Sequence, residues 1–198
     1  MIKFTNLNQE EPYLAFKEKY NDALLAEQKN IEAVCISSYS HESEEVNARY
    51  VNIKYINDRE FIFFSNYRSP KSKDFQTHNQ INALMYWSST NVQIRMKANI
   101  QKTSIEFNNA YFQNRNKKKN ALAISSDQSC IISSYEEVEL RYKKSIENDN
   151  LSQCPDHWGG YSFIPYYFEF WQGHKSRINR RNAYELKNNS WVLSHLQP

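Results

Sequence analysis

The chain of 198 residues contains only three glycines, and all of them lie near its C-terminal end, at Gly159, Gly160 and Gly173. Dinucleotide-binding fingerprints use glycines for a tight turn and for close approach of the backbone to pyrophosphate, and P-loops use them to surround phosphates with backbone N–H groups. Neither motif can be built before Gly159. The distribution therefore excludes Rossmann and Walker-type nucleotide sites, and it also excludes collagen-like and glycine–serine linker architectures.

The rest of the composition indicates one globular domain, with room for a helical appendage. A hydrophobic fraction of 40%, with 15% aromatic residues, is sufficient for a packed core. No stretch has the apolar length needed to cross a bilayer, and the N-terminal segment lacks the three regions of a signal peptide, so we expect a cytoplasmic protein. The net charge of +3 is too small to make nucleic acid the default partner.

The cysteines and histidines show no pattern of a disulfide framework or a metal site. Cys35, Cys130 and Cys154 are odd in number and far apart, without a CxxC pair, and the five histidines have no metal-binding spacing. We therefore expect no metal. The only basic cluster is Lys117–Lys119, and a charge run of this kind, taken alone, predicts a solvated loop.

Hydrophobic periodicity predicts an α+β domain built on an antiparallel barrel. A first helix, from about residue 10 to residue 28, precedes five strands, a helical section and three further strands. The expected strands are Ile31–Ser40, Asn47–Ile56, Glu60–Asn66, Ile81–Ser88, Val92–Lys102, Tyr161–Gln172, Asn182–Leu186 and Trp191–Leu196. The later helices are expected to be a short one opened by Ser69-Pro70, then Ile105–Arg115, a short piece near Ala121, and Ser134–Glu147.

Two cations on one predicted strand suggest anion binding. Arg49 and Lys54 are five residues apart, which places them on opposite faces of a regular strand, so they serve two different anions or none. Farther along, Ser69 opens a helix that carries Lys71 in its first turn. A helix start and a lysine together favour a phosphate monoester, although many basic helix starts bind nothing.

Polar pairs on later elements leave similar alternatives open. Tyr111 and Arg115 are four residues apart on a predicted helix and share one face. A hydroxyl and a guanidinium can clamp an anion there, or the tyrosine stacks on the arginine for packing alone. Gln93 and Arg95 share one face of a strand, which either contacts a ligand or faces water.

The three glycines lie within two aromatic strings, HWGGY at 157–161 and FEFWQG at 168–173, which Ser176 and Arg177 follow. Glycine at such positions indicates that the backbone turns or comes close to another group. Core packing accounts well for Phe168 and Phe170. It accounts less well for Trp171 and Arg177.

Together these strings resemble the pyridoxamine 5′-phosphate oxidase family of FMN flavoproteins, from about residue 10 to the C-terminus. The resemblance is carried by RYVNIK at 49–54, FFSNYRSPKS at 63–72, VQIR at 92–95, YFQNR at 111–115, SSDQS at 125–129, WGGY at 158–161, EFWQG at 169–173 and SRINRR at 176–181. It implies a homodimer of split β-barrels with two FMN sites at the subunit interface. Each chain is then a single domain over 1–198, with the C-terminal segment of the family at about 157–198.

The resemblance also implies roles for individual residues. The FMN-binding residues would be Arg49, Lys54, Phe64, Ser65, Lys71, Gln93, Gln128, Ser129, Trp171 and Arg181. The substrate-binding residues would be Lys54, Tyr111, Arg115, Lys119 and Arg177, and the catalytic residues would be Arg177 and Asn179. The family reaction moves a hydride from the C4′ carbon of the substrate to flavin N5, and oxygen then reoxidises the flavin.

Several positions depart from the family pattern. The family motif Arg-Leu-His-Asp-Arg is Arg177-Ile178-Asn179-Arg180-Arg181 here, so Asn179 replaces a histidine and cannot titrate near neutral pH. Arg180 replaces an acid. Lys119 replaces a serine that binds the substrate phosphate, and Pro70 replaces an arginine beside the lysine that binds the FMN phosphate.

These departures leave three functions open. The first is an FMN-dependent oxidase of pyridoxamine or pyridoxine 5′-phosphate. The second is an FMN-dependent oxidase of the same architecture that acts on another ring compound, as relatives in phenazine biosynthesis do. The third is a non-catalytic protein that binds flavin or pyridoxal phosphate. The residues predicted to hold FMN match the family better than those predicted to hold the substrate, which makes flavin binding the firmer expectation.

Overall fold

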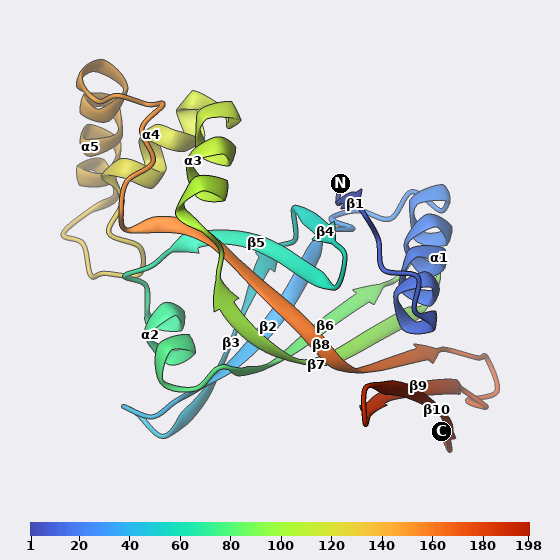
Figure 1. Ribbon diagram of the computed structural model, residues 1–198. Coiled ribbons are helices and arrows are strands. Elements are labelled where there is room, and N and C mark those ends of the chain that lie inside the picture. Colours follow the sequence, from blue (N-terminus) through green and yellow to red (C-terminus); the bar gives the residue numbers. More distant parts are fainter.

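The computed structural model describes residues 1–198 as a ten-stranded sheet with five helices around it (Figure 1). The strands are β1 (Lys3–Thr5), β2 (Ala33–Ser40), β3 (Glu45–Asn52), β4 (Tyr55–Asn57), β5 (Glu60–Asn66), β6 (Gln80–Trp87), β7 (Val92–Lys102), β8 (Trp158–Gln172), β9 (Arg180–Lys187) and β10 (Ser190–Leu196). The helices are α1 (Glu11–Leu25), α2 (Pro70–Thr77), α3 (Ile105–Asn114), α4 (Lys117–Ser125) and α5 (Tyr135–Asn148). None of them combines the length and apolar composition that crossing a membrane requires.

The sheet divides along its longest strand, β8. The strand order is β1-β4-β5-β8-β7-β6-β2-β3, and all of these pairs are antiparallel except β1–β4. The first part of β8 pairs with β5 and its last part pairs with β9, while β7 follows its other edge. The sheet is therefore open rather than closed, and the predicted α+β split-barrel architecture is confirmed.

The predicted strand 47–56 is wrong as a single element, because the chain changes sheet partners inside it. β3 pairs with β2 as far as Asn52, and β4 then pairs with β5. Between them the buried Ile53 donates its N–H to the carbonyl of Glu32, and Lys54 donates its N–H to the carbonyl of Ile62. The break takes Lys54 out of any regular strand, so the alternation of faces no longer governs where its side chain points.

The predicted loop at Lys117–Lys119 is also wrong, since these lysines form the first turn of α4. Asn116 is the N-cap, and its side-chain oxygen accepts the backbone N–H groups of Lys118 and Lys119 at 3.0 and 3.3 Å. An asparagine at this position satisfies two of the free donors at a helix start. Capping by Asn116 thus outweighs the tendency of three like charges to remain in a solvated loop.

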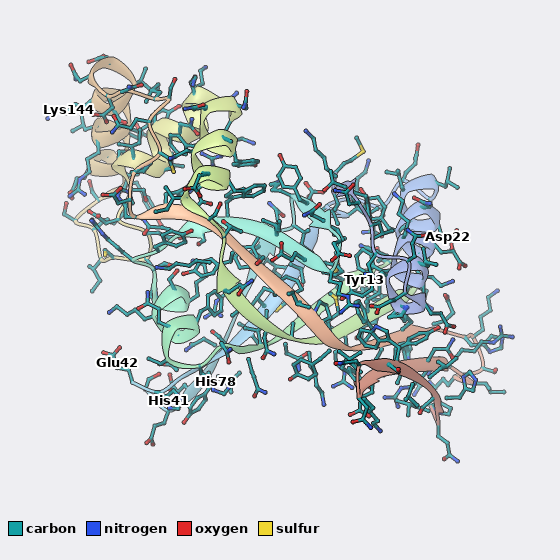
Figure 2. The ribbon with its side chains drawn as sticks, viewed as in Figure 1. Tyr13, Asp22, His41, Glu42, His78 and Lys144 are labelled. Atoms are coloured by element: carbon teal, nitrogen blue, oxygen red, sulfur yellow. The ribbon has the colours of Figure 1, made fainter.

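Helix α1 covers one face of the sheet with aromatic side chains. Tyr13 and Phe16 are fully buried, and the Phe16 ring makes edge contacts with Phe61 at 5.1 Å and with Trp87 at 5.7 Å. Figure 2 shows Tyr13 between α1 and the sheet. Burial of side chains of this size contributes about 1.5–3 kcal/mol each, so this cluster is a main source of stability.

Gly159 and Gly160 allow close packing at the start of β8 rather than an unusual turn, because no glycine has a positive φ. A Cβ on Gly159 would lie 2.2 Å from the hydroxyl of Tyr67, and one on Gly160 would lie 2.4 Å from Oγ1 of Thr103. The side chain of Asn108 in α3 accepts the Gly160 N–H at 2.7 Å and donates to the Tyr67 hydroxyl at 3.0 Å. The glycines therefore fix α3 against β8.

Candidate active site

A cavity of about 890 Å³ lies between the sheet and helices α3 and α4. Residues of β3, β4, β5 and β8 form its floor. Helices α3 and α4, at the upper left in Figure 1, cover it. Its 22 lining residues include no aspartate or glutamate. They include five cations, which are Lys3, Lys54, Lys71, Arg115 and Lys119. Such a lining favours an anionic ligand.

Lys71, in the first turn of α2, is a buried cation without a carboxylate partner. It is 8% exposed, and its Nζ donates to Ser69 Oγ at 2.8 Å and to Gln128 Oε1 at 3.1 Å. Burial and, to a smaller extent, the nearby charge of Arg49 lower the pKa of Lys71 to about 8. A neutral serine and a neutral amide orient the ammonium, but they leave its charge uncompensated.

Arg49, in β3, supplies a second cation near Lys71 and is partly neutralised. Its Nη1 donates to Ser38 Oγ at 2.6 Å, and its Nη2 lies 3.6 Å from a carboxylate oxygen of the buried Asp74. Burial lowers the pKa of Arg49, while the charge of Asp74 opposes the shift. Arg49 and Lys71 together form what we call the inner cation pair.

A second group of cations consists of Lys54, Arg115 and Lys119, which we call the outer cation cluster. Burial lowers the pKa of Lys54, Glu32 opposes this, and the charges of Lys119 and Arg115 lower it further. Lys119 and Arg115 therefore lie close enough to Lys54 to repel its charge. Such repulsion is relieved when an anion binds among them.

Arg115 is oriented by contacts on two sides. Its Nη1 donates to Asn120 Oδ1 at 3.0 Å, and its guanidinium carbon lies 5.0 Å from the ring centroid of Trp158. Burial lowers the pKa of Arg115, and the nearby Tyr111 raises it. Neither the amide nor the indole neutralises the guanidinium, which remains available to an anion.

Stacked aromatic rings form part of the cavity wall. The rings of Phe64 and Tyr111 are nearly parallel at a centroid distance of 3.7 Å, and the ring of Trp158 is nearly parallel to both, at 5.1 Å from Phe64 and 6.2 Å from Tyr111. Tyr55 makes an edge contact with Tyr111 at 5.8 Å. The alternative that Tyr111 stacks on Arg115 for packing alone is wrong, because the Tyr111 ring stacks on Phe64 and the Arg115 guanidinium lies over Trp158.

The cavity brings together most of the residues proposed from the sequence. Those that line it are Lys54, Phe64, Ser65, Lys71, Tyr111, Arg115, Lys119 and Gln128. Arg49 does not line the cavity, but its charge acts on Lys71. Those outside the lining are Gln93, Ser129, Trp171, Arg177, Asn179 and Arg181.

Three of these outside residues are neighbours on adjacent strands. Gln93 pairs with Trp171, and Trp171 pairs with Arg181. Arg181 donates through Nε to Oε1 of the buried Glu169 at 2.9 Å, and Arg95 donates through Nη2 to the other oxygen at 2.5 Å. The side chain of Arg95 is therefore bound to the carboxylate of Glu169 in the same chain, rather than to a ligand or to water alone.

The loop that carries Arg177 and Asn179 is closed by its own side chains. Asn179 Oδ1 accepts the backbone N–H of His174 at 3.0 Å, and Arg177 donates its N–H to the His174 carbonyl at 2.9 Å. Arg177 adopts a φ of 61°. The β9–β10 hairpin that follows lies at the opposite end of the molecule from α3, α4 and α5 (Figure 1). Arg177 and Asn179 are therefore separated from the cavity of their own chain.

Sequence reasoning missed three residues around these features. Lys3 and Tyr55 line the cavity, and Glu169 joins two arginines. The lone acid in the string EFWQG was a usable signal for Glu169, because a buried glutamate requires cationic partners. No local pattern marked Lys3, since its position depends on pairing with β4.

The residues present suit FMN on chemical grounds. A buried lysine without a counter-ion and a neighbouring arginine match a phosphate monoester. The amide of Gln128 and the hydroxyl of Ser65, which donates to Gln128 at 3.3 Å, supply hydrogen-bonding groups beside them. The adjoining aromatic wall suits a flat ring system.

Comparisons with known proteins identify the family. The model of the pyridoxine 5′-phosphate oxidase C-terminal dimerisation region matches residues 158–198. The pyridoxine/pyridoxamine 5′-phosphate oxidase of Pseudomonas putida is 31% identical over 191 residues, which cover 95% of this chain and 89% of the relative. That of Burkholderia cenocepacia is 34% identical over 193 residues, with coverage of 95% and 89%.

Solved structures agree with this assignment at the level of the fold. PhzG from Burkholderia lata, crystallised with tetrahydrophenazine-1-carboxylic acid, superposes with a TM-score of 0.90 at 23% identity and covers 96% of this chain and 93% of its own. A pyridoxamine 5′-phosphate oxidase-related, FMN-binding protein from Nostoc punctiforme gives a TM-score of 0.74 at 12% identity, covering 92% and 97%. The chain therefore belongs to the pyridoxine/pyridoxamine 5′-phosphate oxidase family of FMN flavoproteins.

Proposed function

We propose that the protein is an FMN-dependent oxidase that converts pyridoxamine or pyridoxine 5′-phosphate to pyridoxal 5′-phosphate. The observation that carries this proposal is a single cavity with two groups of cations, a wall of stacked aromatic rings, and no carboxylate in its lining. Two phosphate-bearing aromatic molecules, cofactor and substrate, match this arrangement. The named relatives support the same reaction.

The inner cation pair would hold the phosphate of FMN. Lys71 and Arg49 supply charge, and Gln128 and Ser65 supply hydrogen bonds near the same end of the cavity. A phosphate there replaces the missing counter-ion of Lys71, so its binding offsets the burial of that charge. The cofactor set that the family pattern implies is completed by Lys54, Phe64, Gln93, Ser129, Trp171 and Arg181.

The outer cation cluster would hold the phosphate of the substrate. Arg115, the C-cap residue of α3, presents a planar fork of N–H groups, and Tyr111 presents a hydroxyl from the last turn of that helix. Lys54 and Lys119 add charge from the break before β4 and from the start of α4. The helix start supports the same ligand, because its N-terminal dipole favours an anion.

A homodimer would complete the site. Arg177 and Asn179 lie at the far end of their own chain, and the segment that contains them matches a dimerisation region. We therefore propose that the loop 173–179 of a second copy covers the cavity and brings Arg177 against the substrate ring. FMN, when bound, would supply the two-electron acceptor for a hydride from the C4′ carbon, with O2 as the final acceptor and hydrogen peroxide as its product.

The side chains of this chain would orient the two rings rather than carry electrons. The outer cation cluster fixes the substrate by its phosphate, and the stacked Phe64, Tyr111 and Trp158 limit water on one side. Arg177 would bring a guanidinium group against the substrate ring, where its charge stabilises negative charge that develops on the ring. Such fixed orientation is the protein contribution expected in a cofactor enzyme.

Anaerobic mixing of the FMN-loaded protein with pyridoxamine 5′-phosphate tests this function. We expect bleaching of the flavin absorbance, followed by peroxide formation when air is admitted. Failure of both pyridoxamine and pyridoxine 5′-phosphate to bleach the flavin contradicts the proposal. Bleaching by another ring compound would then indicate an oxidase of the same architecture with a different substrate, which the departures at Asn179, Arg180 and Lys119 favour. If no compound reduces the flavin, a non-catalytic binding protein is indicated.

The substitution Arg177→Ala tests the role of the loop. We expect the rate of flavin reduction to fall about 100-fold or more, because a positioned charge on the reacting ring is lost, while the dissociation constant of FMN changes less than about threefold. Stopped-flow reduction and flavin fluorescence titration measure the two quantities. Equal losses in both would show that Arg177 holds the cofactor instead.

A further inference from the structure

The N-terminal strand β1 is attached to the wall of the cavity by contacts on both sides of Lys3. The N–H of Lys3 donates to the Lys54 carbonyl at 2.9 Å, and β1 pairs in parallel with β4 so that Lys3 lies beside Tyr55. The preceding Ile2 is buried, and its N–H donates to the hydroxyl of Tyr20 at 3.0 Å. The backbone at this position is therefore fixed by the fold.

The side chain of Lys3, in contrast, is exposed and lines the cavity without a carboxylate partner. None of the ion pairs in the molecule includes it, and its Nζ lies 5.9 Å from the ring centroid of Tyr55. Tyr55 in turn contacts Tyr111. Lys3 thus stands on the same wall as the residues proposed to hold the substrate.

We propose that Lys3 is a substrate-binding residue. Its charge makes the outer cation cluster prefer a dianionic phosphate ester to a carboxylate monoanion. This inference rests on the proposed function and adds a fourth cation to the outer cation cluster. Each added charge attracts a dianion about twice as strongly as a carboxylate monoanion at the same distance. A fixed backbone with a mobile ammonium suits this task, because the side chain can reach the phosphate while the strand does not move.

Binding of pyridoxal 5′-phosphate to the FMN-loaded protein tests the proposal without any turnover. We expect Lys3→Gln to weaken this binding about five- to tenfold in low salt, with a much smaller difference in 1 M salt, where charge interactions are screened. Binding of pyridoxal, which lacks the phosphate, and binding of FMN are expected to stay within about twofold. Equilibrium dialysis and flavin fluorescence measure these constants.

Two further variants separate the charge of Lys3 from its place in the fold. Lys3→Arg keeps the charge and should restore wild-type affinity, and Lys29→Gln removes an exposed lysine outside the cavity and should have no effect. Equal affinity of wild type and Lys3→Gln for pyridoxal 5′-phosphate overturns the inference, and so does an equal loss for pyridoxal. If the wild type binds no pyridoxal 5′-phosphate, the proposed function fails and this inference fails with it.

Discussion

Replacement of Lys71 by methionine should make the flavin-free protein more stable and its flavin binding weaker. Burial lowers the pKa of Lys71 from 10.5 to about 8, and this fall corresponds to about 3 kcal/mol of destabilisation at pH 7, where the lysine is charged in both states. Methionine has a similar length and no charge, so Lys71→Met should recover much of that free energy of unfolding.

The sign of the pH dependence follows from the lowered pKa. Between about pH 8 and pH 10.5 the unfolded chain holds the proton of Lys71 while the folded chain has lost it. Since the unfolded state binds more protons in this range, the contribution of Lys71 to stability rises with pH. The difference between the free energies of unfolding of Lys71→Met and wild type should therefore shrink as the pH is raised from 7 to 10.

FMN binding should show the opposite preference. Loss of the ammonium removes a charge-assisted hydrogen bond to the phosphate, which corresponds to an affinity about 10- to 100-fold lower. In the wild type the affinity should fall above about pH 8, as Lys71 loses its proton in the free protein, and Lys71→Met should lack this fall.

Urea unfolding of the flavin-free proteins and flavin fluorescence titration over pH 7–10 measure both effects. Lys73→Met, on the exposed side of the same helix, is the matched control and should change neither quantity. If the FMN affinity of Lys71→Met falls with rising pH to the same extent as that of the wild type, the reasoning is refuted, because another group would then bind the phosphate.

Two further substitutions test the framework around the site. Glu169→Gln should lower the free energy of unfolding by about 2–3 kcal/mol at pH 7, because two arginines lose their shared buried carboxylate. Burial acts to raise the pKa of Glu169, but hydrogen bonds from those arginines hold the pKa below its usual value. The difference in stability from wild type should therefore vanish as acid protonates the carboxyl group. Gly159→Ala should cost about 1–3 kcal/mol, because its Cβ would meet the Tyr67 hydroxyl at 2.2 Å, whereas Gly173→Ala should cost less, because the clash is with the flexible end of an asparagine in an exposed turn. Urea unfolding of each variant checks these values, and an unchanged midpoint for Glu169→Gln or equal losses for the two glycines would contradict them.

Local patterns predicted most elements because those elements are stabilised by their own periodicity. The strands Glu60–Asn66 and Val92–Lys102 have the predicted bounds, since continuous or alternating apolar residues mark both. The failures lie where distant segments decide. The break at Lys54 occurs because the chain changes partner from β2 to β5, and β1 forms only because β4 is available to pair with it.

The candidate site divides in the same way. Motif resemblance indicated Lys71 and Arg115 by position, and the cavity contains both. It gave no indication that Lys71 lacks a counter-ion, because that depends on which side chains the fold brings near it. Likewise, Arg95 and Glu169 are 74 residues apart, so their pairing is invisible to spacing rules. The sequence shows which residues are charged, but only the folded structure shows which of these charges are paired.

Charge balance explains why both ends of the cavity are built against local preference. The first turn of α4 carries Lys117–Lys119 and no acid, although positive charge is unfavourable at a helix N-terminus. Lys71 is buried with only neutral partners. A chain under selection for stability alone would place an acid at either position. A bound phosphate would relieve both unfavourable placements, and local conflict of this kind is typical of a binding site.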